Sequence, residues 1–485
     1  MTGPRSLSIP DDPLLRARAL LIARIAIGVY LVELLLNLTR PHLLPDEPPL
    51  SIFYKLPGSS GSLSRFLAMP EIVFWVVLAG ILAGAAVQIF AAVKNRAGGS
   101  DSAQRAIMLT WITLGCLLLP FALIPLTVVI QYLPVALLCL PSTAIVLLLL
   151  RAAVRFSRMS WSALLAAFAW GALIVFGLSR AYSSLGFGTL WGYTGPAAGT
   201  QLGSFNNGLS HTIEFMIMHL SVFNALSIGA GVVLLLTLLR HRITDSVTGL
   251  VLGAAIGLGY NFVENVLIIK VYGSIGTFLG PTGGFEYWIR QSIGLLGGQV
   301  TFGALLGAGL AAARSARRRK FIVTASLIAA IGGSTGAETL SGWLAGQARD
   351  HVDIGSTLDT LVISPFFWLL PQLPFTALAA GLLVTGLCSR APVLRKAVAA
   401  EATESAAISQ AETKILASPV LRFWALVSTW RAYGRPTARA LHQLQSAQLE
   451  LAAWRAQNHP AAAAEGDELR ARVMRMKDEH RAVNS

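Results

Sequence analysis

The chain has 485 residues, of which 54% are hydrophobic and only 13% are charged, and its mean hydropathy is +0.63. A soluble protein of this length carries about 25% charged residues, so the composition excludes a soluble globular enzyme. The formal net charge is +14. Because Lys and Arg are dispersed beside apolar runs, this charge indicates membrane topology and anionic lipids at basic cytosolic loops rather than nucleic acid.

Apolar runs of about 20 residues recur along the chain, and each is long enough to cross a bilayer. The first begins near Ala19 and has no small-residue cleavage site, so we expect a retained span rather than a signal peptide. Pro120 and Pro125 predict a tight return between the third and fourth spans. The ten predicted spans are 19–38, 70–93, 106–124, 127–150, 160–181, 210–238, 247–269, 288–312, 321–345 and 358–388.

Lys and Arg gather on alternate loops, which predicts a multi-pass protein of the cell (cytoplasmic) membrane with both termini in the cytoplasm. The predicted fold is all-α, a polytopic membrane helix bundle of about ten transmembrane helices with a small cytosolic helical C-terminal tail. The predicted parts are a cytosolic segment (1–18), N-terminal transmembrane helices (19–205), a core of four transmembrane helices (206–346), the last transmembrane helix (347–389) and the basic tail (390–485).

The three cysteines, Cys116, Cys139 and Cys388, lie in or beside apolar runs, which favours buried thiols over disulfides or a metal site. The tail is rich in Ala, Glu, Arg and Gln and predicts three or four helices, interrupted near 434–436 and 458–460. Its last two helices are expected to pair as an antiparallel hairpin, with Asp467 as the N-cap of the final one. Such a tail is typical of docking or regulation by a partner that the sequence does not identify.

Acidic residues are rare within the predicted spans, where each costs roughly 2.5–3.5 kcal/mol and should face protein or a watery cavity. The mid-span acids are Glu33, Glu214, Glu264 and Glu338. In the seventh span, a small-residue ridge (Gly249, Gly253, Gly257) continues at helical spacing into Tyr260, Asn261 and Glu264. Glu264 is therefore expected inside the bundle. A structural polar clamp between helices is the alternative to a functional site.

The neighbouring spans repeat this pattern. In the eighth, Gln299 is flanked by the pairs Gly294/Gly298 and Gly303/Gly307; the ninth carries GGSTGAET up to Thr339; the sixth carries His211, Glu214 and His219. Polar groups at depth in four consecutive spans indicate a cavity. Glutamates could act there as acid or base. The amides of Asn261, Asn265 and Gln299, together with Tyr260, could orient substrate or stabilise an oxyanion, which suits peptide-bond hydrolysis.

These residues resemble the PrsW-type intramembrane proteases, distant relatives of the CAAX prenyl proteases, over the sixth to ninth spans. The family's second motif reads D-x-x-x-G-x-x-x-G-x-x-x-G-x-G-F-x-x-x-E-N. Eight positions here correspond, with Tyr in place of Phe: Asp245, Gly249, Gly253, Gly257, Gly259, Tyr260, Glu264 and Asn265. Its third motif is matched at Phe302 and Gly307, but Gln299 stands where the family has His.

Two other motifs depart further from the family pattern. The first motif, a Glu-Glu pair followed by Lys, is reduced to Glu214 beside Phe215, and the last motif's His position holds the sequence Ser334-Thr335-Gly336. The family implies a divalent metal, but its expected His ligands are missing here. The spacing of His211, Glu214 and His219 is also not that of a helical metal site.

The resemblance implies a bacterial intramembrane endopeptidase that cleaves membrane-spanning proteins of the anti-sigma-factor type in regulated proteolysis. Its implied catalytic residues are Glu264, with Glu214 as a second candidate that could help to activate water. Two alternatives remain. One is a catalytically inactive relative that binds transmembrane helices, as the missing His and Lys suggest; the other is a solute transporter, which the absence of matching repeats makes the least favoured.

Overall fold

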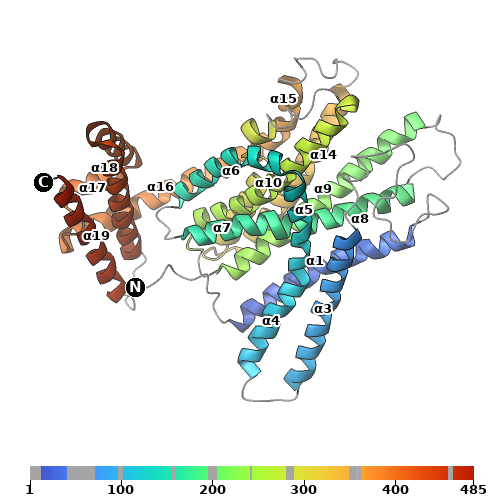
Figure 1. Ribbon diagram of the computed structural model, residues 1–485, viewed down its shortest axis with the longest axis horizontal. Helices are drawn as coiled ribbons and strands as arrows, with labels where there is room; N and C mark the ends of the chain where they lie inside the picture. The colour runs from blue at the N-terminus through green and yellow to red at the C-terminus, as the bar shows by residue number, and fades with distance from the viewer. Residues whose placement is uncertain are drawn as a thin grey trace. The chain divides into compact units, whose positions relative to one another are not determined.

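The computed structural model describes residues 12–40, 71–96, 102–154, 159–194, 205–240, 243–279, 289–348, 358, 362–456 and 463–484. These residues form helices and short helical turns but no strands (Figure 1). Nine of their helices are long and apolar enough to cross a membrane, which confirms the predicted polytopic helical bundle. The chain divides into a membrane unit (Met1–Leu150 with Ser162–Ala379) and a tail unit (Arg151–Trp161 with Ala380–Ser485).

The first helices of the membrane unit contribute to an apolar core that later helices of the same unit complete. They are α1 (Pro13–Thr39), α3 (Glu71–Arg96) and α4 (Ser102–Leu118). The Asp12 carboxylate caps α1 by accepting a 2.9 Å hydrogen bond from the Leu14 amide. Tyr30 of α1 meets Phe121 edge-on, with ring centroids 5.5 Å apart, and both side chains are fully buried.

The predicted return at Pro120 and Pro125 is wrong. The chain passes through both prolines as a 3₁₀ turn, η1 (Leu119–Ala122), and a helix, α5 (Leu123–Gln131), so one apolar segment extends over Arg105–Gln131. Each proline lies in the first turn of its element, where a missing backbone N–H costs little. The helix breaks instead at Tyr132, before α6 (Leu133–Ala153).

The next helices in the chain pack around α10. They are α7 (Trp161–Trp170), a π-helical turn η2 (Gly171–Val175), α8 (Phe176–Thr194) and α9 (Phe205–Leu238). Then α10 (Ser246–Leu279) runs through the membrane unit in contact with α5, α7, η2, α8 and α9 (Figure 1). In the most apolar stretch of α10, 94% of the residues are buried, compared with 17% in the corresponding stretch of α3. A polar residue in the middle of α10 therefore faces protein.

Glycines explain how α10 is so closely surrounded. On one face, a methyl group added at Gly249, Gly253 or Gly257 would clash with backbone carbonyl oxygens of α12 (Gln299–Ala312), including those of Gly303 and Gly307. On another face, Gly259 lies against the Phe168 carbonyl, and Gly171 of η2 lies against that of Ile256. The absence of side chains at these positions brings the helix backbones into contact.

The eighth predicted span, 288–312, is not one helix. A π-helical turn, η5 (Ile289–Ile293), is followed by a non-helical segment, Gly294–Gly298, and α12 begins only at Gln299. Gly298 has φ 54°, a left-handed conformation that glycine adopts without strain. After α12 come α13 (Arg319–Leu327), a π-helical turn η6 (Ile328–Gly332), α14 (Gly333–Ala348), α15 (Ser364–Leu369), η8 (Leu370–Gln372) and α16 (Leu373–Glu404).

The tail unit has its own packing. It contains the end of α16 together with α17 (Gln410–Ala417), α18 (Pro419–Ala456) and α19 (Ala463–Asn484). The predicted interruption near 434–436 is a kink at Gly434, where φ is 84°; the one near 458–460 lies outside the described residues. Trp454 lies against Gly466, while Val473 packs near Leu444, so α18 and α19 run antiparallel as expected.

One detail of the tail differs from expectation. Asp467 does not cap α19, because the helix begins four residues earlier, at Ala463. The Asp467 carboxylate instead accepts a 3.0 Å hydrogen bond from Arg470, one turn along the same helix.

Candidate functional site

A polar cluster lies where the middle of α10 meets the non-helical segment before α12. Asp245 starts α10 by accepting a 2.9 Å hydrogen bond from the Thr248 amide, which fixes the register of the helix. Five turns later, Glu264 forms an ion pair with Arg290 of η5, with 3.6 Å between Oε2 and Nη1. The Glu264 side chain is 26% exposed and that of Arg290 is 18% exposed, so neither member of the pair is fully buried.

The two asparagines of α10 hold the backbone of the following segment. Asn265 Nδ2 donates to the Arg290 carbonyl at 3.5 Å, and Asn261 Nδ2 donates to the Gly297 carbonyl at 3.4 Å. Both asparagines are buried. Their amide nitrogens thus satisfy carbonyl groups that helical hydrogen bonds leave free where the eighth segment unwinds.

A glutamine from η8 supports the same segment from the other side. Gln372 Oε1 accepts a 2.6 Å hydrogen bond from the Gly298 amide, and its Nε2 donates to the Trp368 carbonyl at 3.2 Å. The Trp368 ring in turn faces the Arg290 guanidinium, 5.9 Å from its centroid. The position of Arg290 is therefore fixed by α10, η5 and α15 together.

Gln299, the first residue of α12, connects the cluster to α14. Its Nε2 donates to Ser334 Oγ at 3.2 Å and to Glu338 Oε1 at 3.3 Å. The Ser221 hydroxyl of α9 also donates to the Glu338 carboxylate. Because a carboxylate only accepts hydrogen bonds, the contact with Glu338 identifies the amide nitrogen of Gln299 and directs its oxygen the other way.

The charges of the cluster balance. The carboxylates of Glu264 and Glu338 interact electrostatically with each other and with Arg290. Arg180 of α8 interacts electrostatically with Glu264 and with Tyr260. Two carboxylates thus share their surroundings with two guanidinium groups, which reduces the cost of keeping all four groups inside a bundle.

Tyr260 connects the cluster to a second set of hydrogen-bonded polar side chains, which lies between α8 and α9. Its hydroxyl lies 3.2 Å from Ser179 Oγ, and Ser179 donates to Asn224 Oδ1 at 2.7 Å. Ser183 donates to the same oxygen at 2.6 Å. The Tyr260 ring packs on Phe176, with centroids 5.4 Å apart, so the side chain is fixed at both ends.

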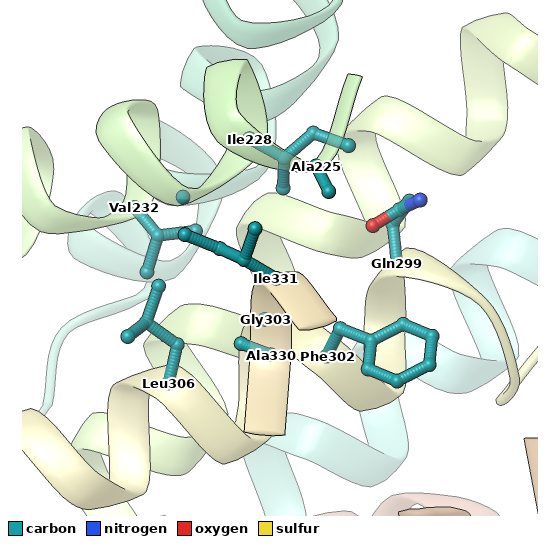
Figure 2. Close-up of a pocket in the computed structure, with 10 residues that line it drawn as sticks. Ala225, Ile228, Val232, Gln299, Phe302, Gly303, Leu306, Ala330 and Ile331 are labelled. Atoms are coloured by element: carbon teal, nitrogen blue, oxygen red, sulfur yellow. The ribbon is translucent and has the colours of Figure 1, made fainter. Parts of the chain in front are cut away.

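A small hollow opens beside Gln299. Figure 2 shows the Gln299 amide oxygen on the side of this hollow and its nitrogen on the other side. Gln299 is 4% exposed, and its Oε1 has no hydrogen-bond partner. The other lining residues are apolar or glycine and come from α9, α12 and η6: Ala225, Ile228, Gly229, Val232, Phe302, Gly303, Leu306, Ala330 and Ile331.

The structure brings together most residues that the sequence singled out. Tyr260, Asn261, Glu264, Asn265 and Gln299 all lie in the cluster. Gly249, Gly253 and Gly257 form the contact with Gly303 and Gly307. Glu214 lies within α9, but its side chain and those of His211 and His219 are outside the described residues.

Sequence reasoning missed three charged members of the cluster. Glu338 was recognised as a mid-span acid but not as a site residue, although the run of small and hydroxylic residues before it was a usable signal. Arg180 and Arg290 are not among the residues that the sequence singles out. Their place beside Glu264 depends on how α8 and η5 pack against α10, which local sequence does not encode.

Residues 159–333 match the family model described as PrsW family intramembrane metalloprotease, which confirms the resemblance found in the sequence. The match begins at the fifth predicted span and ends within the ninth, so it includes Glu264 and Gln299 and stops just before Ser334 and Glu338. No curated protein and no solved structure matches the chain.

The family description implies a metal ion, and the donor set in the described part of the chain does not fit one. There, no three His, Cys, Asp or Glu side chains come close enough to hold an ion. Within the cluster, Glu264 is paired with a guanidinium, and the amide nitrogen of Gln299 faces Glu338. A divalent metal prefers imidazole, thiolate or carboxylate ligands free of such cations.

Proposed function

We propose that the chain is an intramembrane endopeptidase that cleaves membrane-spanning proteins, with Glu264 as the base that activates water. The observation that carries this proposal is the polar cluster of Glu264, Glu338, Gln299 and Arg290, within and beside the region that matches a protease family. Such a cluster is costly inside a bundle and is a functional candidate for that reason.

The two carboxylates differ in a way that suits an acid and a base. Glu264 is partly exposed, with 26% of its side-chain surface accessible, so water can reach it. Glu338 accepts hydrogen bonds from Gln299 and Ser221. In the proposed reaction, Glu264 takes a proton from water as the water oxygen attacks the peptide carbonyl carbon. Glu338, ionised in the resting cluster and protonated when substrate binds, then gives its proton to the amine as the C–N bond breaks.

The cations and the free amide oxygen have separate roles in this scheme. Arg290 and Arg180 stabilise the negative charge that develops on the carbonyl oxygen. Gln299 Oε1, which lacks a hydrogen-bond partner, accepts a hydrogen bond from a backbone N–H of an unwound substrate that passes beside the hollow. Asn261 and Asn265 act by holding the segment that carries Arg290, because their amide nitrogens already bind its carbonyls.

The proposal also covers the substrate class, the role of Glu214 and the binding partners. The resemblance favours substrates with a single span, of the anti-sigma-factor type, and a second contribution to water activation by Glu214. No step uses a metal ion, because the donor set in the described residues does not fit one. The basic loops would hold anionic lipids, and the tail would recruit a further partner.

A catalytically inactive protein that binds transmembrane helices is the second candidate. It is favoured by the Glu264–Arg290 ion pair, which engages the proposed base, and by the loss of the family's first motif around Glu214. Such a protein would bind an unwound helix beside the same cluster without cleaving it.

Reconstitution separates the two candidates. The purified chain in liposomes is incubated with single-span reporter proteins that carry a tag at each end, and wild type is compared with Glu264→Gln and Glu338→Gln. The proposal predicts cleavage within the span by wild type and at least a hundredfold slower cleavage by both variants. Glu450→Gln, a change in the tail unit, serves as the matched control and should cleave like wild type. Capture of the same uncleaved reporter by all four proteins would instead establish the inactive candidate.

A further inference from the structure

The first half of α18, Pro419–Tyr433, presents large apolar side chains outward. Four of them are aromatic, and the most exposed is Tyr433, at 70%. The ring centroids of Phe423 and Trp424 lie 5.9 Å apart, and neither ring is covered. We call this set the aromatic surface: Val420, Leu421, Phe423, Trp424, Trp430 and Tyr433.

The tail unit does not need the aromatic surface for its own core. Two clusters form that core, one around Ile408, Leu416 and Leu449 and one around Leu451 and Val473. Each of these side chains is at most 1% exposed. The kink at Gly434 separates the first half of α18 from the second half, which carries most of the core contacts. A patch of this kind, outside a satisfied core, marks an interaction site.

The charge around the aromatic surface selects its partner. Residues 413–449 contain no Asp or Glu but carry five Lys or Arg. Arg431, Arg435 and Arg439 are exposed, and the Arg435 guanidinium lies 5.9 Å from the centroid of the Trp430 ring. Helices that lie in a bilayer interface have this composition, with aromatic and aliphatic side chains on one side and arginines beside them.

The place of the surface in the chain points to the same partner. Among the described residues, α16 contains the last apolar segment long enough to cross a membrane, and the aromatic surface begins shortly after α16 ends at Glu404. The tail is thus tethered to a bilayer at all times, which gives the lipid surface a high effective concentration. Trp and Tyr favour the headgroup level, and each Lys or Arg is attracted to anionic lipid.

We propose that the first half of α18 docks on the leaflet that adjoins the tail, with its aromatic surface in the headgroup region and Arg431, Arg435 and Arg439 on anionic phospholipid. This site is independent of the polar cluster and of proteolysis. It explains why a unit with a complete core leaves six large apolar side chains uncovered.

Spin-label accessibility tests this docking in the full-length chain. With Cys116, Cys139 and Cys388 replaced, a nitroxide is attached at Ser428→Cys, an exposed position within Pro419–Tyr433, or at Gln443→Cys, an exposed position in the second half of α18. Each protein is placed in nanodiscs of phosphatidylcholine, with or without phosphatidylglycerol. Collisions with membrane-soluble oxygen and with a water-soluble nickel chelate are then compared.

The expected result is a label at 428 that is reached by oxygen and shielded from nickel in anionic nanodiscs, while the label at 443 stays accessible to nickel. Replacing Arg431, Arg435 and Arg439 by Gln should weaken this state by roughly fivefold per arginine. Equal nickel access at 428 and 443 in both lipids would overturn the proposal. So would shielding at 428 that requires two chains in one nanodisc, because that result would indicate a second copy as the partner.

Discussion

Replacing Glu401 by Gln should loosen the tail unit. The Glu401 side chain is fully buried at the end of α16 and accepts hydrogen bonds from Arg470 Nε at 2.6 Å, Arg455 Nη1 at 2.8 Å and Ser405 Oγ at 2.8 Å. Burial alone would raise the pKa of this carboxyl, but these hydrogen bonds outweigh it and lower the pKa from 4.5 to about 2. That difference corresponds to roughly 3 kcal/mol of folding free energy.

The pH dependence of this stabilisation follows from the direction of the pKa shift of Glu401. Because the folded-state pKa lies below the unfolded one, the ionised carboxylate stabilises the tail unit fully above about pH 4.5, and the stabilisation is lost as the pH falls towards 2. Glu401→Gln removes the charge at every pH. The variant should therefore differ most from wild type near neutral pH and approach wild type near pH 2.

Hydrogen exchange of the full-length chain in detergent micelles measures this effect. At pH 7, amides of α19 and of the second half of α18 should exchange up to roughly a hundredfold faster in Glu401→Gln, after correction for intrinsic rates. In the variant, Arg455 still binds Glu404 and Arg470 still binds Asp467, so the hundredfold increase is an upper limit. Glu450→Gln is the matched control, because its 3.4 Å contact with Arg472 is exposed and worth about 0–1 kcal/mol. Equal protection in both variants would refute the reasoning.

Two further changes test the packing and polar contacts around α10. Gly253→Ala should destabilise the membrane unit by about 1–3 kcal/mol, because the new methyl group meets the Gly303 carbonyl, whereas Gly336→Ala should be neutral since nothing lies within 4 Å; equal melting temperatures in detergent would contradict this. Gln372→Leu should cost about 1–3 kcal/mol by leaving the Gly298 amide without its acceptor. Unchanged hydrogen exchange of the Gly298 amide would show that this bond is unimportant.

The seventh span was the most predictable part of the bundle. Its glycines recur at helical spacing, and a strip of missing side chains has one structural use, the close approach of another helix. The polar residues that follow on the same face must then be inside, which the burial of Asn261 and Asn265 reflects. Local sequence sufficed here because the pattern and the packing have the same period.

The eighth span was not predictable in the same way. Gly294 and Gly298 were taken as small residues of a helix, whereas the chain is non-helical there. The unwound backbone depends on groups distant in sequence, since Asn261 binds the Gly297 carbonyl and Gln372 binds the Gly298 amide. A sequence window contains the glycines but not these partners, so the break and the position of Arg290 follow only from tertiary structure.

The central claim is that Glu264 activates water for cleavage of a membrane-spanning protein. The most direct test compares native membranes that contain wild type or Glu264→Gln, by mass spectrometry of protein termini. The proposal predicts new termini inside or beside transmembrane segments with wild type only, and these termini would identify the substrate. Identical sets of termini from both proteins, under several stress conditions, would contradict it and leave the chain as a protein that binds helices without cutting them.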